Sequence, residues 1–220
     1  AMEFQRHLLL AAIFIVPCNG LCEHGTLSNK EVRSDSATYV KKMLCGNEAL
    51  VVFMSNEGQN NHPICWRSQY GGTRIGGFQH NLTYYRLNSR GETEGGSWNI
   101  RNTTYRVSRM NNGATVGVRA YMGNGSRDAD LFRVYNVYYA SADCFIMGTP
   151  LSETTSFDKK HLNRGIYQKP PDSSRCLLWA PESSHSALRT CQEKYSRICS
   201  NVGISAYHYN ETECRILAPL

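Results

Sequence analysis

The chain has 220 residues, of which 41% are hydrophobic and 19% charged, and it carries a formal net charge of +6. This length suits one domain with a core of its own rather than a miniprotein that depends on disulfides. Lysine and arginine are dispersed along the chain, which is typical of a solvated surface and gives no reason to expect nucleic acid as a partner. Attraction to an anionic ligand or an acidic partner stays open.

The N-terminus has the pattern of a secretory signal peptide. Arg6 and His7 precede an apolar run over residues 8–17, and Cys18, Asn19 and Gly20 follow as small residues at the cleavage position. A membrane anchor needs about 20 apolar residues, and this run is half as long. We therefore expect a signal peptide over 1–20, a single domain over 21–220, secretion, and no membrane attachment after cleavage.

The cysteines point to disulfides. Cleavage after Gly20 removes Cys18 and leaves an even number, which favours this cut over one after Cys22. Oxidising surroundings then allow four disulfides, but eight cysteines permit 105 pairings, so spacing alone assigns none. The remaining cysteines are Cys22, Cys45, Cys65, Cys144, Cys176, Cys191, Cys199 and Cys214.

Glycosylation acceptors support the same compartment. Asn-x-Ser/Thr occurs at Asn81, Asn102, Asn124 and Asn210, and several such motifs behind a signal peptide are expected to carry glycans.

The domain begins with a short helix and continues as strands. Ser34 and Asp35 are candidate caps, and Ala37, Val40 and Leu44 share one helical face. A glycine-rich stretch over 71–77 is expected to break the second strand. Alternation and turn residues predict strands over 49–54, 64–70, 80–87, 98–107, 114–121, 131–139, 143–148 and 175–180.

A second helix is expected after the last strand. Pro181 ends the apolar run over 176–179, and Ser183 and Ser184 offer oxygens for an N-cap. Its apolar face is formed by Leu188, Cys191, Tyr195 and Ile198.

Short strands joined by turns, with one terminal helix, favour an all-β fold, an eight-stranded antiparallel up-and-down barrel, over a βαβ fold. The connection over 149–174 is long and polar, with Pro170 and Pro171 near its end. Such a loop is either a lid or partner-binding flap, or a surface insertion without function.

With these elements in place, the chain resembles the salivary lipocalins of ticks. The resemblance rests on the strand from Asp143 to Ile146, the strand from Cys176 to Trp179, the helix with Cys191, and the late Cys214. It implies a lipocalin barrel with a closed bottom, a ligand cavity and a helix stapled to it by disulfides. It also implies the pairs Cys65–Cys214 and Cys144–Cys191; the remaining cysteines are allocated as Cys176–Cys199 and Cys22–Cys45.

One departure from the family bears on the ligand. Amine-binding members carry an acid just after the cysteine that corresponds to Cys144 and another two positions before the tryptophan that corresponds to Trp179. Here these positions are Phe145 and Leu177. A buried ammonium needs a carboxylate, so histamine or serotonin binding is not expected unless another acid faces the interior. The other acids considered are predicted in or beside turns: Glu48, Glu57, Glu92 and Glu94.

Alternation along two strands selects candidate ligand-binding residues. If the glycan acceptors Asn81 and Asn102 point outward, their alternate neighbours point inward. Inward arginines need a carboxylate from the protein or from a ligand, which favours a lipid acid such as an eicosanoid. Alternatively, a bulge shifts the register and both arginines face water. The inward set is Leu82, Tyr84, Arg86, Arg101, Thr103, Tyr105 and Val107, and Tyr138 and Trp179 are wall residues or plain core.

Function is expected to be binding. No zinc-protease, nucleophile-elbow or phosphate-loop motif occurs in the sequence, so neither an enzyme nor a cofactor is expected. The first hypothesis is a monomeric scavenger that holds a small host mediator, a lipid or a biogenic amine, and so suppresses inflammation or haemostasis. The second is an immunomodulator that binds a host protein, a complement component or a receptor, through its outer loops.

Overall fold

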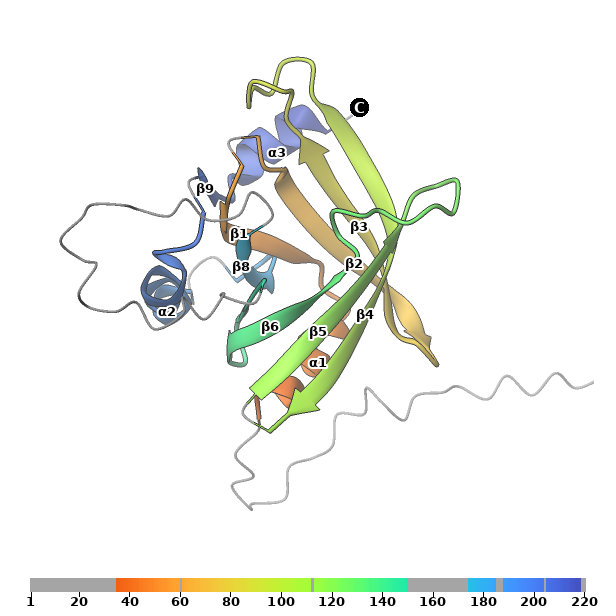
Figure 1. Cartoon of the computed structure of the whole chain (residues 1–220), viewed down its shortest axis with the longest axis vertical. Coiled ribbons are helices and arrows are strands. Elements are labelled where there is room, and N and C mark those ends of the chain that lie inside the picture. The colour runs from red at the N-terminus through yellow and green to blue at the C-terminus, as the bar shows by residue number, and fades with distance from the viewer. Residues whose placement is uncertain are drawn as a thin grey trace, which may run out of the picture. The chain divides into compact units, whose positions relative to one another are not determined.

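Eight antiparallel strands form a closed barrel in the part of the chain that the structure describes (Figure 1). The computed structural model describes residues 35–59, 61–111, 113–149, 174–184, 188–203 and 205–218. Each strand pairs with the next, and β1 pairs with both β8 and β2, so the sheet closes on itself. The up-and-down barrel expected from the sequence is therefore confirmed. The strands are β1 Leu50–Glu57, β2 Ile64–Arg74, β3 Gly77–Arg86, β4 Ser97–Met110, β5 Gly113–Tyr121, β6 Arg133–Ala140, β7 Phe145–Gly148 and β8 Arg175–Pro181.

The glycine-rich stretch bends the sheet instead of ending β2. Gly72 lies at a register shift in β2 and has a φ of +133°, a conformation that suits glycine. Gly77 begins β3 so close to β4 that a Cβ there would lie 2.2 Å from the carbonyl oxygen of Tyr105. The two glycines allow β2 and β3 to form one long hairpin, so the expectation of a break was wrong.

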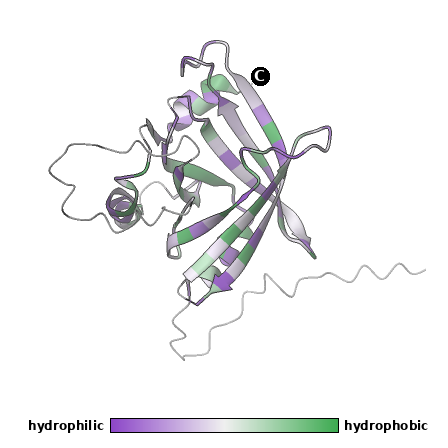
Figure 2. Cartoon of the chain, in the orientation of Figure 1, coloured by the Kyte–Doolittle hydropathy of each residue, from purple (hydrophilic) through white to green (hydrophobic). Residues whose placement is uncertain are grey.

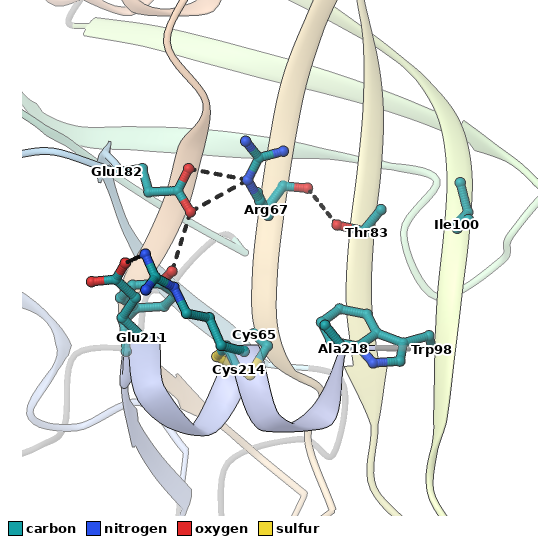
Figure 3. Close-up of a pocket in the computed structure, with 11 residues that line it drawn as sticks. Cys65, Arg67, Thr83, Trp98, Ile100, Glu182, Glu211, Cys214 and Ala218 are labelled. Atoms are coloured by element: carbon teal, nitrogen blue, oxygen red, sulfur yellow. Dashed lines mark hydrogen bonds and ion pairs between the residues drawn. A yellow bond between two sulfur atoms is a disulfide. The ribbon is translucent and has the colours of Figure 1, made fainter. Parts of the chain in front are cut away.

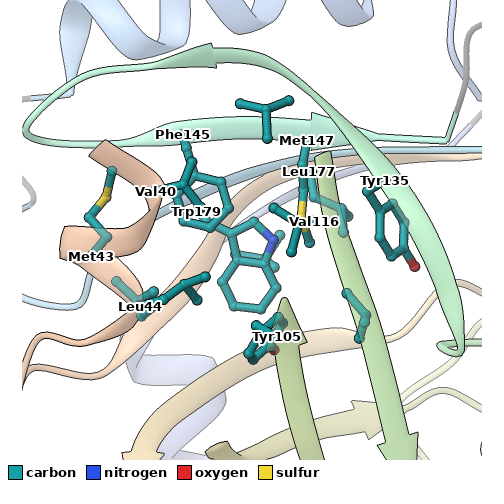
Figure 4. Close-up of a cluster of buried hydrophobic side chains, with 14 of the residues drawn as sticks. Val40, Met43, Leu44, Tyr105, Val116, Tyr135, Phe145, Met147, Leu177 and Trp179 are labelled. Atoms are coloured by element: carbon teal, nitrogen blue, oxygen red, sulfur yellow. The ribbon is translucent and has the colours of Figure 1, made fainter. Parts of the chain in front are cut away.

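Alternate residues of the strands fill the barrel. Hydrophilic and hydrophobic residues are interspersed along β4 and β5, as a wall with one wet face requires (Figure 2). Trp179 lies in the middle of the interior cluster, with its indole among side chains from several strands and from the N-terminal helix (Figure 4). Burial of such side chains is the main source of the barrel's stability.

Helix α1, Ser36–Leu44, lies across the end of the barrel that holds the β4–β5 hairpin (Figure 1). The Asp35 carboxylate accepts a hydrogen bond of 2.9 Å from the backbone N–H of Thr38, which confirms Asp35 as the cap. Ala37, Val40 and Leu44 are buried in the interior cluster, so the predicted inner face is confirmed.

A buried chain of hydrogen bonds ties this helix to the barrel. His80 Nε2 donates to the carbonyl oxygen of Leu44 at 2.8 Å, because a carbonyl only accepts. His80 Nδ1 then accepts from the hydroxyl of Ser68 at 3.0 Å, and Ser68 Oγ lies 3.2 Å from the hydroxyl of Tyr105. Burial lowers the pKa of His80, which keeps the ring neutral in this position.

Helix α2, Arg189–Cys199, packs on the outside of the barrel. Cys191, Tyr195 and Cys199 are buried in a cluster with the outward side chains of β7 and β8, so the predicted apolar face is largely confirmed. The predicted caps are wrong: the residue before the helix is Leu188, which makes no side-chain cap bond. Ser184 instead donates its backbone N–H to the carbonyl of Pro181 in a turn.

Two further elements were not predicted. Strand β9, Ser205–His208, pairs with the half of β1 that follows Met54, beyond the point where β2 leaves this edge. Helix α3, Glu211–Leu217, follows directly and is capped by Asn210, whose side chain accepts from the N–H of Glu213.

Three disulfides occur among the described residues: Cys65–Cys214, Cys144–Cys191 and Cys176–Cys199. They agree with the pairings that were expected for these cysteines. They join α3 to β2, and α2 to the segment before β7 and to β8. The expected signal peptide, Cys22 with its pairing to Cys45, and residues 150–173 of the long connection lie outside the described residues.

Candidate functional site

The barrel end opposite α1 carries charged side chains inside a mostly apolar wall. Arg101 Nε donates to Asp128 Oδ2 at 2.6 Å, and the hydroxyl of Tyr84 donates to the same oxygen at 3.0 Å. Although burial alone would raise it, these two hydrogen bonds hold the pKa of Asp128 below its ordinary value. Arg101 and Asp128 are both buried, and the carboxylate of Asp128 neutralises the charge of Arg101 within the protein.

A second buried pair joins β1 to β8. Glu57 and Arg175 are directly opposite in the register, and Arg175 Nε lies 3.6 Å from Glu57 Oε2. This distance is short enough for an ion pair but too long for a hydrogen bond. Burial raises the pKa of Glu57 to about 7, although the charge of Arg175 acts to lower it. Arg175 donates instead to the carbonyl oxygen of Asp130, at 3.3 Å.

Several buried polar atoms have no hydrogen-bond partner among the described residues; those of Ser55, Glu57 and His62 lie toward this pair, whereas Trp179 lies toward α1 (Figure 4). They belong to Ser55 and Glu57 on β1, Trp179 on β8, and His62 in the connection after β1. Ser55 and Glu57 lie opposite Leu177 and Arg175, whose strand positions face the interior. Each unpartnered group costs about 1–3 kcal/mol, so water or a ligand normally satisfies such atoms. The atoms are Ser55 Oγ, Glu57 Oε1 and Oε2, His62 Nδ1 and Nε2, and Trp179 Nε1.

His62 is neutral in this environment. Its side chain is buried, and its ring lies edge-on to Tyr207 with centroids 6.0 Å apart. Burial lowers the pKa of His62 to about 4, and the nearby positive charge of Arg175 contributes in the same direction. A neutral imidazole has one donor and one acceptor nitrogen, so His62 offers both to a bound molecule.

Aromatic rings separate the two buried arginines. Trp66 stacks on Tyr84 with centroids 4.5 Å apart. The guanidinium of Arg101 lies 5.5 Å from the Tyr84 ring, and that of Arg175 lies 6.0 Å from the Trp66 ring. Cation–π attraction therefore fixes both arginines against one aromatic wall.

The structure brings four of the six predicted ligand residues to the interior. Tyr84, Arg101, Tyr105 and Trp179 are buried and face it. Whether they contact a ligand stays a prediction.

The other two predicted ligand residues are placed differently. Arg86 lies exposed at the end of β3, where it pairs with Asp130 at 3.1 Å. Tyr138 packs in the outer cluster with α2, and its hydroxyl donates to the carbonyl oxygen of Thr149 at 2.5 Å. Tyr138 follows the inward Val137, so strict alternation already turns it outward, and a register shift between Val137 and Tyr139 places Tyr139 on the same outer side. The alternative in which both arginines face water is wrong for Arg101, which is buried, whereas Arg86 does face water at the end of β3.

Sequence reasoning missed the acids that matter. Glu57 was expected in or beside a turn, but β1 extends to it and its exposed fraction is 1%. Asp128 follows a glycine-rich turn that was expected only to connect two strands. The alternation of β1 does not reveal Glu57, because a register shift between Val52 and Met54 interrupts the pattern. Phe145 and Leu177, the two positions at which an acid was considered for amine binding, are buried in the interior cluster, so neither supplies a carboxylate.

A separate pocket lies outside the barrel, between α3 and strands β2 to β4 (Figure 3). Its volume is about 490 Å³. Arg67 and Glu182 form an ion pair of 3.1 Å at one side, and Trp98 and Ala218 lie at the other. Trp98 Nε1 donates to the carbonyl oxygen of Leu217, which anchors the end of α3 to β4.

Two searches of the described residues gave negative results. No cluster of three or more His, Cys, Asp or Glu side chains suitable for a metal ion occurs there. No helix in that part of the chain is both long and apolar enough to span a bilayer.

Comparison with known proteins gives no family assignment. No protein-family model and no curated protein sequence matches the chain. Among solved structures, the chain is similar to Japanin from Rhipicephalus appendiculatus bound to cholesterol, with a TM-score of 0.46 and 13% sequence identity. The match covers 76% of this chain and 95% of that one. At these values the likeness carries no information about function, which we infer instead from the side chains at the barrel end opposite α1.

Proposed function

We propose that this protein is a secreted lipocalin of the tick salivary type that captures one small host mediator inside its barrel. Capture is stoichiometric: the protein lowers the free concentration of the mediator and so suppresses inflammation or haemostasis. One observation carries the proposal, namely the buried polar atoms of Ser55, Glu57 and His62 that have no hydrogen-bond partner among the described residues. A ligand that hydrogen-bonds to them would recover the free energy that their burial costs.

The chemistry of these atoms supports a biogenic amine over a lipid acid. Arg86 and Arg101 were the residues that favoured a lipid acid, but Asp130 and Asp128 already pair with them. Glu57 is an interior acid whose two oxygens accept no hydrogen bond from any described residue, and Arg175 at 3.6 Å is an ion pair only, so an ammonium group can donate to the carboxylate. The aromatic rings of Trp66 and Tyr84 supply an apolar surface for the body of a small amine.

A fluorescence titration tests this proposal. Trp66 and Trp179 are interior and buried, so a ligand beside them should change their emission, and Trp98→Phe removes the outer tryptophan. Histamine, serotonin and arachidonic acid are the probes. We expect saturable amine binding that Glu57→Gln weakens about tenfold or more, because a charge-assisted hydrogen bond contributes about 1.5–3 kcal/mol.

The matched control is Glu94→Gln, which removes an exposed acid from the β3–β4 connection. It should leave amine affinity unchanged. If arachidonic acid binds and neither amine does, the lipid form of the proposal replaces the amine form. If no probe binds, or if both variants lose affinity equally, the Glu57 site is wrong.

The alternative function, binding of a host protein such as a complement component or a receptor, has one structural observation in its favour. Two large apolar side chains near the outer pocket are exposed, Ile100 by 63% and Ile216 by 77%. Exposed apolar residues beside a pocket are typical of protein contacts. Immobilised protein that retains one serum protein, and retains it equally well as Glu57→Gln, would favour this alternative.

A further inference from the structure

The fold gathers arginines that are far apart in the sequence onto one outer face of the barrel. Arg74 pairs with Gly77, and Gly77 lies against Arg106, since a Cβ on this glycine would be 3.4 Å from the Arg106 Cα. Arg106 in turn pairs with Gly117 on β5. Residues that pair in this way share one face of a sheet.

Arg119 extends the row along β5. It pairs with Thr104, whose hydroxyl accepts from the outward side chain of Gln79 at 2.7 Å, so Arg119 is on the same outer face. Adjacent strands are about 4.8 Å apart, so Arg74 and Arg106, two strands apart, are separated by about 10 Å. Arg106 and Arg119 are diagonal neighbours at about 7 Å. The three arginines therefore form a short, spaced row along the outer face.

The charges of this row are not neutralised within the described part of the chain. Arg74, Arg106 and Arg119 are exposed and make no ion pair or hydrogen bond with any described residue. By contrast, the exposed arginines Arg67 and Arg109 each pair with a carboxylate. Strands β2 to β6 contain no aspartate or glutamate, so no acid within these strands screens the row.

A groove runs beside Arg106 and Arg119. Its volume is about 430 Å³, and Gly117 leaves space between the two arginines. Ser108 and Thr115 line it with hydroxyl groups. At its other side lies Phe132, whose ring is covered by the guanidinium of Arg127 with 4.8 Å between the charged carbon and the ring centroid.

We propose that this face binds a sulfated polysaccharide, with sulfate groups between Arg106 and Arg119 and toward Arg74. Guanidinium groups bind oxyanions through paired hydrogen bonds and lose hydration more easily than ammonium groups. A linear chain with repeated sulfates matches charges that are spaced along a row, whereas a single small anion uses one site only. The groove is lined by hydroxyl groups and glycine as well as by the apolar Phe132 and Val134, so the spacing of the arginines is what favours a linear polyanion, and the net charge of +6 supports attraction to it.

The test is the affinity of the full secreted chain for immobilised heparin. Arg106→Gln with Arg119→Gln should elute at clearly lower salt and bind about tenfold more weakly, because each exposed contact contributes modestly and the two add. The matched control is Arg90→Gln with Arg197→Gln, which removes the same charge from exposed positions on a loop and on α2. Circular dichroism checks that each variant folds.

An unchanged elution of the Arg106 and Arg119 variant, or an equal shift in the control, would overturn the proposal, since net charge alone would then explain binding. Retention by phosphatidylserine vesicles without retention by heparin would overturn it as well. Glu57→Gln should leave heparin affinity unchanged, so this test and that of the interior site fail independently. Enzymatic removal of any glycan on Asn102 should not reduce retention on heparin, because the arginines, and not the glycan, bind the sulfate groups.

Discussion

Among single residues, Glu57 stands out because its carboxyl group is almost completely removed from water. Its exposed fraction is 1%, and this burial raises its pKa to about 7 from an ordinary value of 4.5. The folded protein therefore binds a proton more tightly than the unfolded chain between these values. Stability must then fall as pH rises through this window, because the folded state gives up a proton that the unfolded chain has already lost.

This gives a pH prediction for Glu57→Gln. Between pH 5 and pH 8, the wild-type protein should lose about 3 kcal/mol of unfolding free energy relative to the variant, which cannot titrate at this position. His62 titrates in both proteins, so its contribution cancels. Urea denaturation of both proteins at the two pH values measures the difference. A difference that does not change with pH would show that Glu57 is ionised throughout.

Asp128 is the second residue whose role can be separated by mutation. Asp128→Asn leaves the buried charge of Arg101 without its carboxylate, and should destabilise the protein by about 3 kcal/mol. Asp130→Asn breaks the exposed pair with Arg86 and should cost less than about 1 kcal/mol. Equal losses in urea denaturation would contradict the assignment of Asp128 as the buried partner.

At the scale of elements, the local signals were predictable and the long-range ones were not. Helix α1 was predicted because its cap, Asp35, and its apolar spacing lie within nine residues. Strand β9 is short and has little local signal, whereas helix α3 has one that was overlooked, the cap Asn210 three positions before Glu213. They form because β1 has an open edge after Met54 and because Cys65 and Cys214, 149 positions apart, are joined. The bulge in β1 hid Glu57 for the same reason, since only pairing with β8 reveals it.

Helix α2 offers a prediction at this scale. It is held by Cys144–Cys191 and Cys176–Cys199; Arg189, Glu193 and Arg197 are exposed, while Lys194 lies over the Tyr139 ring of β6. Replacing Cys144 and Cys191 by alanine should cost about 3–4 kcal/mol on a chain-entropy estimate for a loop of this size. Hydrogen exchange should rise first in α2, while β3 to β5 stay protected. Uniform loss of protection would mean that this bond holds the whole barrel and not only the helix.

At the scale of the whole molecule, the barrel has one end closed and one end lined by charges. Helix α1 and its hydrogen bond to His80 close the first end. The second end holds two buried ion pairs, an aromatic wall, and polar atoms of Ser55, Glu57 and His62 that have no hydrogen-bond partner among the described residues. An eight-stranded barrel is just wide enough for side chains or one small ligand, so occupancy depends on these groups. The barrel was predictable from the spacing of the strands, whereas Glu57, the acid proposed to bind the ligand, was not.

Native mass spectrometry of the secreted protein with histamine or serotonin shows whether Glu57 holds one amine inside the barrel. We expect a complex of one amine per chain for the wild-type protein, loss of that complex for Glu57→Gln, and its retention by Glu94→Gln. Two results would contradict this role of Glu57. One is a folded wild-type protein that binds neither amine, and the other is a complex that Glu57→Gln retains.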